Sequence, residues 1–295
     1  MKKVVITGAT GFVGSNLVKY LIDKNFEIGI IIRKDSDLSI LDSVFDKLTV
    51  FQYNYDLDDL IVFFKEFKPN LVFHLASKFI AEHKSNQIDD LVSSNIAFGL
   101  NILEAMRISG VNKLVNTGTS WQHYNNESYN PVCLYAATKQ SFESLLEYYI
   151  QAENFRAITL KLFDTYGEND KRPKLINLLH KYSDENIELN MSMGNQLLNL
   201  VHVNDVCKAY LLSYNIINSD ENKNSHQIYS LKSENNYSLK QVIELFKKVT
   251  NKQIKVNWGG RPNRKREVMK LWDKGRNLPN WIPDISLAEG LKKYD

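Results

Sequence analysis

The sequence has little cysteine and no long apolar run. Two cysteines, Cys133 and Cys207, occur among 295 residues, far apart and without other metal ligands nearby. This argues against a disulfide framework and a zinc site, so we expect no metal and a reducing, cytoplasmic location. The longest purely aliphatic runs have three residues, as at Ile30–Ile32, and the apolar start Val4–Ile6 leads directly into Thr7. We therefore expect neither a membrane-spanning helix nor a signal peptide.

A large excess of one charge is also missing. Lys and Arg number 37 and Asp and Glu 34, a net charge of +3 spread along the chain. This balance gives no reason to expect nucleic acid or a membrane surface as a partner. Hydrophobic residues make up 43% and charged residues 24%, as in ordinary globular proteins, which argues against the disordered, fibrous and low-complexity classes.

The first half alternates short β-branched runs with longer segments of helical apolar spacing, which predicts a parallel sheet covered by helices. The expected strands are Lys3–Thr7, Glu27–Arg33, Leu48–Gln52, Leu71–Leu75, Lys113–Thr117 and Ala157–Leu162. The expected helices are Phe12–Lys24, Leu57–Phe67, Ile88–Ser109, Leu134–Ala152 and, further on, Asn204–Ile217 and Leu239–Thr250. The predicted fold class is α/β with a doubly wound parallel (Rossmann) sheet.

Three glycines follow the first strand. Gly8, Gly11 and Gly14 mark a tight turn and a helix start directly after Lys3–Thr7. Unpaired amides at such a helix N-terminus bind a pyrophosphate, and side chains there would block its approach. A turn that served structure alone would not explain why the third glycine falls inside the helix. This pattern predicts a dinucleotide site.

The end of the second strand indicates which dinucleotide is bound. Arg33, Lys34 and Asp35 stand there. A guanidinium pairs with the 2′-phosphate of NADP, whereas a carboxylate accepts hydrogen bonds from the ribose of NAD. Arg33 and Lys34 favour NADP(H) over NAD(H). Asp35 leaves NAD as an alternative cofactor. Arg33 and Lys34 could also belong to a solvated loop that does not contact the cofactor.

We expect residues 1–165 to form the cofactor-binding domain, with a returning segment at about 199–220. Residues 166–295 form mainly a smaller mixed α/β domain over its strand ends. A ligand would lie between the two.

Tyr135 and Lys139 stand four residues apart and share one face of a helix. An ammonium beside a phenol favours the phenolate and lowers the pKa of that phenol from its usual value of about 10. The preceding strand end supplies the hydroxyl of Thr119, which can hold a substrate oxygen. A tyrosine and lysine at this spacing are more commonly a surface pair, and the nearby Thr119 favours catalysis here.

The order of these motifs resembles the extended short-chain dehydrogenase/reductases that act on nucleotide sugars. The resemblance covers nearly the whole chain and includes Phe73–Ser77, Leu162–Gly167, Asn199–Val206 and Ser286–Leu291. It implies a homodimer in which Ile88–Ser109 and Leu134–Ala152 form a four-helix bundle with their partner copies.

The resemblance also assigns site residues. The catalytic group would be Tyr135, Lys139 and Thr119, with Lys139 on the nicotinamide ribose. The cofactor would meet Gly8, Thr10, Gly11, Phe12, Val13, Gly14, Arg33, Lys34, Asp56, Leu57, Leu75, Ala76, Ser77, Asn95 and Thr117, besides Tyr135 and Lys139. The substrate would meet Thr119, Ser120, Trp121, His123, Asp164, Arg261 and Arg264. Asp56 could instead only cap a helix, His74 could be a core histidine, and Arg261 and Arg264 could be a solvated surface.

Members that dehydrate sugars carry an Asp-Glu pair directly after the Ser or Thr. This chain has Ser120 and Trp121 there, and an indole does not move a proton in this chemistry. Asp164 stands where the family usually has Asn. The segments Thr119–Tyr124 and Leu162–Gly167 look most like reductases of NDP-4-keto-6-deoxyhexoses of the CDP-abequose synthase type, which make deoxysugars for surface polysaccharides such as O-antigen. Alternatives are an epimerase with tightly held NAD and a non-catalytic NADP-binding regulator.

Overall fold

The computed structural model describes residues 2–219 and 225–293. A seven-stranded sheet lies at the centre, with the order β11-β6-β5-β4-β1-β2-β3 and parallel pairing between all neighbours. Its strands are β1 Lys3–Thr7, β2 Glu27–Ile32, β3 Leu48–Gln52, β4 Leu71–His74, β5 Lys113–Thr119, β6 Arg156–Leu162 and β11 His226–Leu231. The doubly wound α/β fold predicted from the sequence is confirmed.

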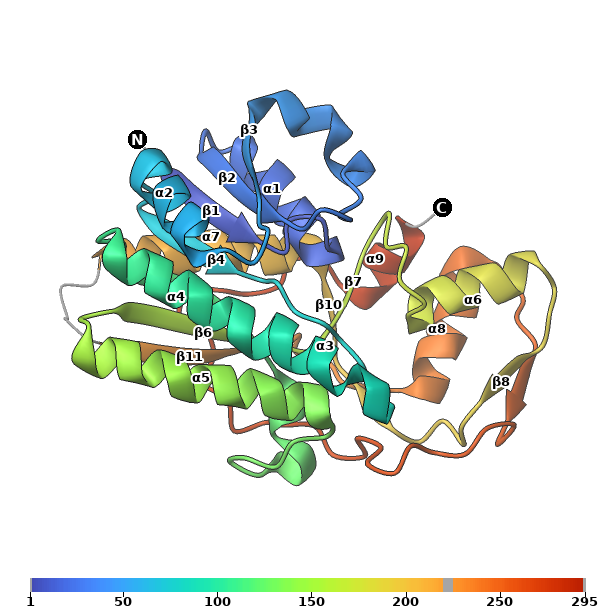
Figure 1. The fold of residues 1–295 in the computed structure, drawn as a ribbon. Coiled ribbons are helices and arrows are strands. Elements are labelled where there is room, and N and C mark those ends of the chain that lie inside the picture. The colour runs from blue at the N-terminus through green and yellow to red at the C-terminus, as the bar shows by residue number, and fades with distance from the viewer. Residues whose placement is uncertain (1, 220–224, 294–295) are drawn as a thin grey trace.

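Helices cover both faces of this sheet (Figure 1). On one face lie α1 (Phe12–Ile22) and α7 (Val203–Ser219), and on the other α2 (Leu57–Phe67), α4 (Phe98–Ile108) and α5 (Leu134–Ala152). Successive strand residues explain the two cores, because Val4 and Ile6 face α1 whereas Val5 faces α2. Burial on both faces accounts for strands that read as continuous apolar runs.

A smaller part of the molecule lies beyond the carboxyl ends of the strands (Figure 1). It contains α6 Leu175–Asp184, α8 Leu239–Thr250 and α9 Leu287–Lys292. Short strands complete it: β7 Asp164–Tyr166, β8 Leu189–Met191, β9 Leu197–Leu198, β10 Leu200–His202, β12 Tyr237–Ser238 and β13 Val256–Trp258. A core of its own, which includes Leu179, Val242 and Phe246, holds it together. Within the described residues, none of the helices is long and apolar enough to cross a membrane.

Most of the predicted elements differ from the structure by at most two residues at either end. The helix expected over Ile88–Ser109 consists of α3 (Ile88–Val92), a π-helical turn at Ser93–Ala97, and α4. β5 continues to Thr119 because its last residues pair with β6. The sequence analysis missed β11, which adds residues 226–231 to the larger part of the molecule. The returning segment was expected at about 199–220, and its last residue lies outside the described residues.

Candidate active site

The glycine turn has the geometry of an anion cradle. Gly8 has φ +71°, and a Cβ on it would stand 2.7 Å from the Ala76 amide nitrogen. A Cβ on Gly14 would stand 2.0 Å from the Gly8 carbonyl oxygen. Gly11 is the N-cap of α1 and has no side chain that could cap the helix, so the amides of the first turn remain for a ligand. The residues present therefore fit the pyrophosphate of a dinucleotide.

Two cavities meet at this turn and share Gly8, Gly11, Leu75 and Ser77 as walls. One, of about 340 Å³, extends to Arg33 at the end of β2. The other, of about 270 Å³, extends to the carboxyl ends of β5 and β6. Thr10 and Ala76 line the first, and Phe12, Val13, Gly14 and Thr117 line the second. An elongated ligand with a central pyrophosphate matches this arrangement.

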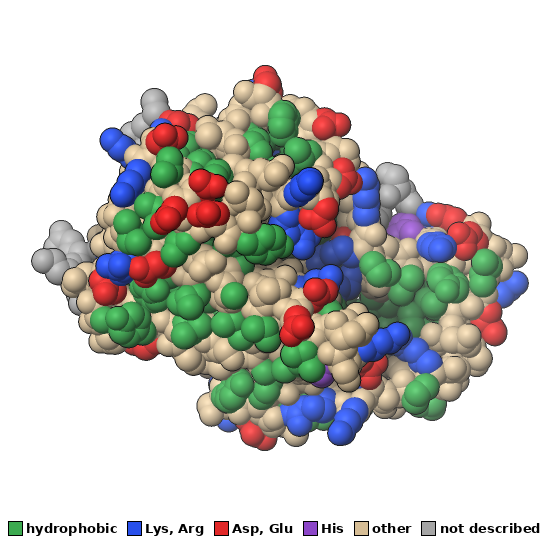
Figure 2. All heavy atoms as spheres, in the orientation of Figure 1, with side chains coloured by type: hydrophobic (Ala, Val, Ile, Leu, Met, Phe, Trp, Pro, Cys, Tyr) green, Lys and Arg blue, Asp and Glu red, His purple; other side chains and the backbone are tan. Residues whose placement is uncertain are grey.

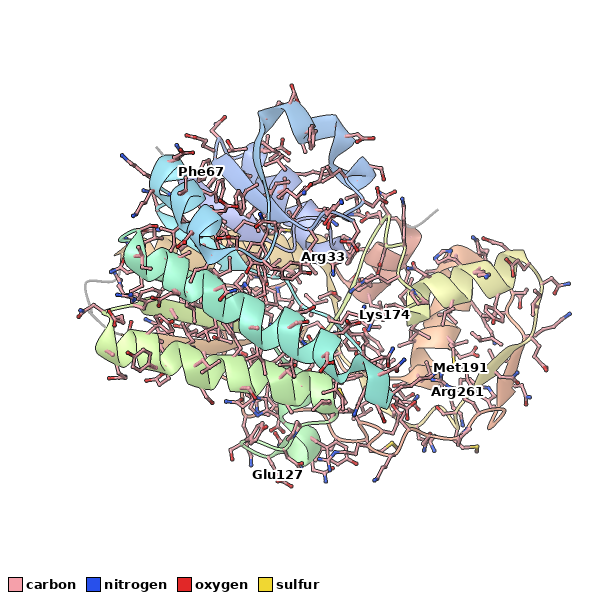
Figure 3. The ribbon with its side chains drawn as sticks, in the orientation of Figure 1. Arg33, Phe67, Glu127, Lys174, Met191 and Arg261 are labelled. Atoms are coloured by element: carbon pink, nitrogen blue, oxygen red, sulfur yellow. The ribbon has the colours of Figure 1, made fainter. Side chains whose placement is uncertain are left out.

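Arg33 and Lys78 are cationic residues on the wall of the first cavity, whereas Lys34 does not line it. The Arg33 side chain is 60% exposed and lies 3.7 Å from Asp35, a distance at which solvent leaves it free to meet another anion. Its backbone amide donates to Ser36 Oγ at 3.0 Å. Figure 3 shows Arg33 on the larger part of the molecule, on the side next to the smaller part.

Asp56 and Leu57 do not line either cavity. The Asp56 carboxylate accepts hydrogen bonds from the amides of Asp58 and Asp59, which makes it the N-cap of α2. Tyr53 and Tyr55 line the first cavity in their place. The sequence analysis missed both rings.

Two further polar residues act from beneath the cavities. His74 is fully buried, bonds to Thr7 Oγ1 at 3.0 Å, and has a pKa lowered to about 3 by burial and by the charge of Lys139. It is a neutral core histidine. Asn95 lies in the π-helical turn, where its amide bonds to the backbone of Lys78 and to Thr138 Oγ1. It fixes the segment after β4 against α5 and is not on a cavity wall.

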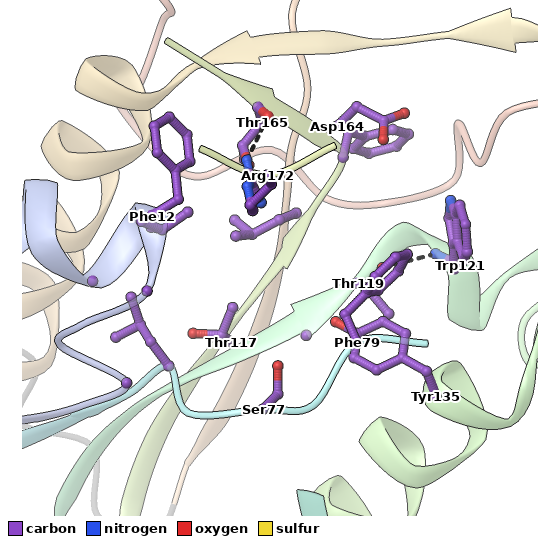
Figure 4. Close-up of a pocket in the computed structure, with 18 of the residues that line it drawn as sticks. Phe12, Ser77, Phe79, Thr117, Thr119, Trp121, Tyr135, Asp164, Thr165 and Arg172 are labelled. Atoms are coloured by element: carbon purple, nitrogen blue, oxygen red, sulfur yellow. Dashed lines mark hydrogen bonds between the residues drawn. The ribbon is translucent and has the colours of Figure 1, made fainter. Parts of the chain in front are cut away.

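Tyr135 and Thr119 both point into the second cavity (Figure 4). Tyr135 lies in the first turn of α5, with its ring edge-on to Phe79 at 5.0 Å. Burial raises the pKa of Tyr135 to about 12, opposed by the interaction with Ser77. The Trp121 amide donates to Thr119 Oγ1 at 3.3 Å, so the Thr119 hydroxyl proton remains available for a ligand.

Lys139 lies one helical turn from Tyr135 and is 1% exposed. Burial lowers the pKa of Lys139 to about 8, and the charge of Glu143 opposes this. The side chain does not contribute to the cavity walls. Its predicted influence on Tyr135 stays a prediction, because the cation whose charge lowers the pKa of that phenol is Arg172.

A third cavity, of about 850 Å³, lies between the two parts of the molecule. Every residue predicted to meet a substrate except Thr119 lines it: Ser120, Trp121, His123, Asp164, Arg261 and Arg264. Figure 2 shows Lys and Arg side chains gathered at the hollow there. Its cationic walls suit an anionic ligand.

These side chains are not equally free. Arg264 is paired with the buried Glu267 at 2.7 Å and lies over the Trp121 ring at 5.1 Å. His123 stacks on Trp272 at 3.9 Å, and its Nε2 has no hydrogen-bond partner among the described residues. Burial raises the pKa of the Asp164 carboxyl, opposed first by the charge of Lys174.

The structure adds three residues that the sequence analysis missed. Phe79, Arg172 and Lys174 line both the second and the third cavity. The Lys174 ammonium lies 4.0 Å above the Phe79 ring, and the Arg172 guanidinium 4.4 Å above the Phe12 ring. The charged run that contains Arg172 and Lys174 was visible in the sequence, but its place opposite the glycine turn was not.

The fold and these cavities define a Rossmann-type protein with a glycine turn that fits a dinucleotide and, facing it, a second cavity with cationic walls. A model of the NAD dependent epimerase/dehydratase family matches residues 4–230, and the chain belongs to this family. The resemblance inferred from the motifs is thereby confirmed.

Individual relatives extend over nearly the whole chain. A CDP-abequose synthase of Yersinia pseudotuberculosis is 27% identical over 278 residues, which are 94% of this chain and 94% of that protein. The structure of a UDP-glucose 4-epimerase from Thermotoga maritima with UDP-glucose has a TM-score of 0.85 and 21% identity, covering 99% and 96% of the two chains. A Thermus thermophilus UDP-glucose 4-epimerase in complex with NAD has a TM-score of 0.81 and 22% identity, covering 98% and 96%.

Proposed function

We propose that the protein is an NADPH-dependent reductase of the C4 ketone of an NDP-4-keto-6-deoxyhexose. The observation that carries this proposal is the convergence of Tyr135 and Thr119 in a cavity that begins at the glycine turn and adjoins the cationic third cavity. The similarity to a CDP-abequose synthase supports a nucleotide sugar as the substrate.

The protein groups have separate roles in this proposal. The Tyr135 phenol gives its proton to the ketone oxygen, and the Thr119 hydroxyl donates a hydrogen bond to the alkoxide as it forms. The raised pKa of Tyr135 keeps its phenol protonated before the reaction. The buried Lys139 ammonium favours the phenolate that is left afterwards. When bound, NADPH supplies the hydride.

The substrate's diphosphate would meet Arg261, whose side chain lines the third cavity and is exposed. Arg264 is the weaker candidate, since Glu267 already neutralises it. Asp164 lines the second and third cavities, and none of the described residues donates a hydrogen bond to its carboxylate. A carboxylate repels a diphosphate, so Asp164 would accept hydrogen bonds from sugar hydroxyls.

Trp121 argues against dehydration. Its ring packs 5.5 Å from Phe79, at the position where the dehydrating enzymes described above carry a carboxylate. Ketone reduction moves one proton, which Tyr135 supplies, whereas loss of the C6 hydroxyl needs a further acid.

An epimerase is the second candidate, and the fold shared with two UDP-glucose 4-epimerases supports it. An epimerase needs no net reductant, so it would retain its cofactor through purification and turn over without added NADPH. A non-catalytic regulator would need neither Tyr135 nor Thr119 in its cavity.

The test is NADPH oxidation with CDP-, dTDP- and GDP-4-keto-6-deoxyhexoses, with the product's configuration determined by NMR. We expect stoichiometric oxidation of NADPH with one of them. Interconversion of two nucleotide sugars without NADPH consumption would establish the epimerase instead.

A further inference from the structure

A buried ion pair lies directly beneath the candidate catalytic residues. Lys161 on β6 and Glu143 on α5 approach to 2.9 Å, with side chains 3% and 4% exposed. Removing two charges from water is costly, and apolar residues of similar volume commonly stabilise a core equally well. Stability alone therefore gives no reason for this pair.

The pair is connected to the catalytic strand end through one glutamine. The Gln122 amide donates to Glu143 Oε1 at 3.0 Å and to Gln140 Oε1 at 2.7 Å. Its carbonyl oxygen accepts from the backbone N–H of Thr119 at 3.0 Å. Both the amide nitrogen and the carbonyl oxygen of the Gln122 side chain thus form hydrogen bonds. Through Gln122 and Glu143, the backbone of Thr119 is connected to α5.

Gly118 makes this approach feasible. A Cβ on Gly118 would stand 3.0 Å from Glu143 Oε1 and 3.1 Å from Gln122 Oε1. The residue before Thr119 therefore leaves room for the carboxylate to reach the strand.

The same carboxylate has a second cation beside it. Lys139 precedes Glu143 by four residues on α5, so their side chains are neighbours on one helix face. The Lys161 ammonium, which reaches Glu143 from β6, competes with Lys139 for that carboxylate. Two cations and one carboxylate leave one positive charge in surplus in this part of the core.

Other titratable groups pack against this cluster. His74 on β4 is neutral, as described above. His226 on β11 has its pKa lowered by burial, and its Nδ1 lies 3.3 Å from the half-exposed Glu147. The pKa of His123 is also lowered by burial. With these histidines neutral near pH 7.5, Lys139, Lys161 and Glu143 set the charge.

We propose that the Glu143–Lys161 pair is a positioning device, which fixes Thr119 through Gln122 and, by occupying Glu143, leaves the Lys139 ammonium free to serve Tyr135. The catalytic part of this inference rests on the proposed function. Its electrostatic part does not, since it concerns the charge of Lys139 in the free protein.

The experiment titrates Lys139 directly. Protein labelled with ¹³C at lysine Cε gives one NMR signal per lysine, and the Lys139→Met variant identifies the signal of Lys139. Glu143→Gln removes the carboxylate that attracts the Lys139 ammonium, so the titration midpoint of Lys139 should move about 1 pH unit down from the wild-type value. Lys161→Met removes the second cation, which competes for Glu143, so the titration midpoint of Lys139 should move about 1 pH unit up. The double variant should return close to wild type.

Glu147→Gln, one turn further along α5, is the matched control and should leave the midpoint in place. The inference is overturned if the two single variants shift the midpoint in the same direction or not at all, or if Glu147→Gln shifts it equally. Should a single variant fail to fold, the double variant decides: a wild-type midpoint supports the inference and a displaced one overturns it.

Kinetics test the catalytic part. In Glu143→Gln we expect kcat to fall at least tenfold while the KM for NADPH stays within about twofold, because the altered groups lie beneath the site. An unchanged kcat overturns the positioning role. If no sugar is reduced by wild-type protein, the proposed function fails, and the NMR titration still decides the charge arrangement.

Discussion

Replacing Tyr135 with Phe tests the proposed proton donor with little disturbance to its surroundings. The ring keeps its edge-on contact with Phe79 at 5.0 Å, and the lost hydroxyl contributes about 1 kcal/mol to stability. General acid catalysis is typically worth about 10²–10⁴ in rate. We therefore expect kcat to fall by at least a hundredfold, with NADPH affinity nearly unchanged because the glycine turn is untouched.

The assay follows NADPH absorbance with the best 4-keto-6-deoxy substrate, and fluorescence titration measures cofactor affinity. Tyr148→Phe is the matched control, since Tyr148 lies on the same helix with 60% of its surface exposed. That variant should keep wild-type turnover. A Tyr135→Phe variant with more than about a tenth of wild-type kcat would refute the assignment of Tyr135 as the acid.

The remaining predictions concern cofactor, pH, reaction and assembly. Arg33→Ala should weaken NADP binding about tenfold and leave NAD binding unchanged; equal wild-type affinities for NAD and NADP, by titration, would remove the argument. Because burial lowers the pKa of Lys139 to about 8, its charge is lost on going above that pH, and kcat should fall there in a pH profile; a kcat that stays level to pH 10 contradicts the role of the ammonium. CDP-glucose or dTDP-glucose with oxidised cofactor should give no 4-keto-6-deoxy product, and accumulation of that product would make the chain a dehydratase, with His123 as the first suspect for the acid. Val92, Ile108 and Tyr148, all at least 40% exposed on the α3, α4 and α5 helices, favour the homodimer through a four-helix bundle; light scattering should give twice 34.1 kDa, and a monomer mass at micromolar concentration contradicts it.

Local chemistry made several helices of the fold predictable. The helices Leu57–Phe67, Leu134–Ala152 and Leu239–Thr250 have the bounds expected from their apolar spacing, because amphipathic periodicity and capping residues act within a few positions of the chain. The glycine turn was equally legible. A Cβ on Gly14 would overlap the backbone of Gly8, which is close in sequence, and a Cβ on Gly8 would overlap the backbone of Ala76, just after the neighbouring strand β4. Residue type alone therefore marks the turn.

Contacts between distant segments were decided by the tertiary structure. The strand His226–Leu231 was missed because its place beside β6 depends on pairing across more than sixty residues. Asp56 became a helix cap while Tyr53 and Tyr55 took the cavity wall, since the direction of β3 and the turn after it set which side chains face inward.

The substrate side shows the same division most clearly. Tyr135, Lys139 and Thr119 were identifiable from a spacing of four residues and a polar strand end. Their surroundings were not identifiable. Lys161 on β6 pairs with Glu143 on α5 because this strand and this helix pack together. Arg172 and Lys174 line the same cavity as the glycine turn only through the packing of the smaller part. The sequence by itself determined which chemical groups are available, because residue types and helical spacing are local. The tertiary structure decided which charges share a buried space, because desolvation and proximity depend on the whole fold.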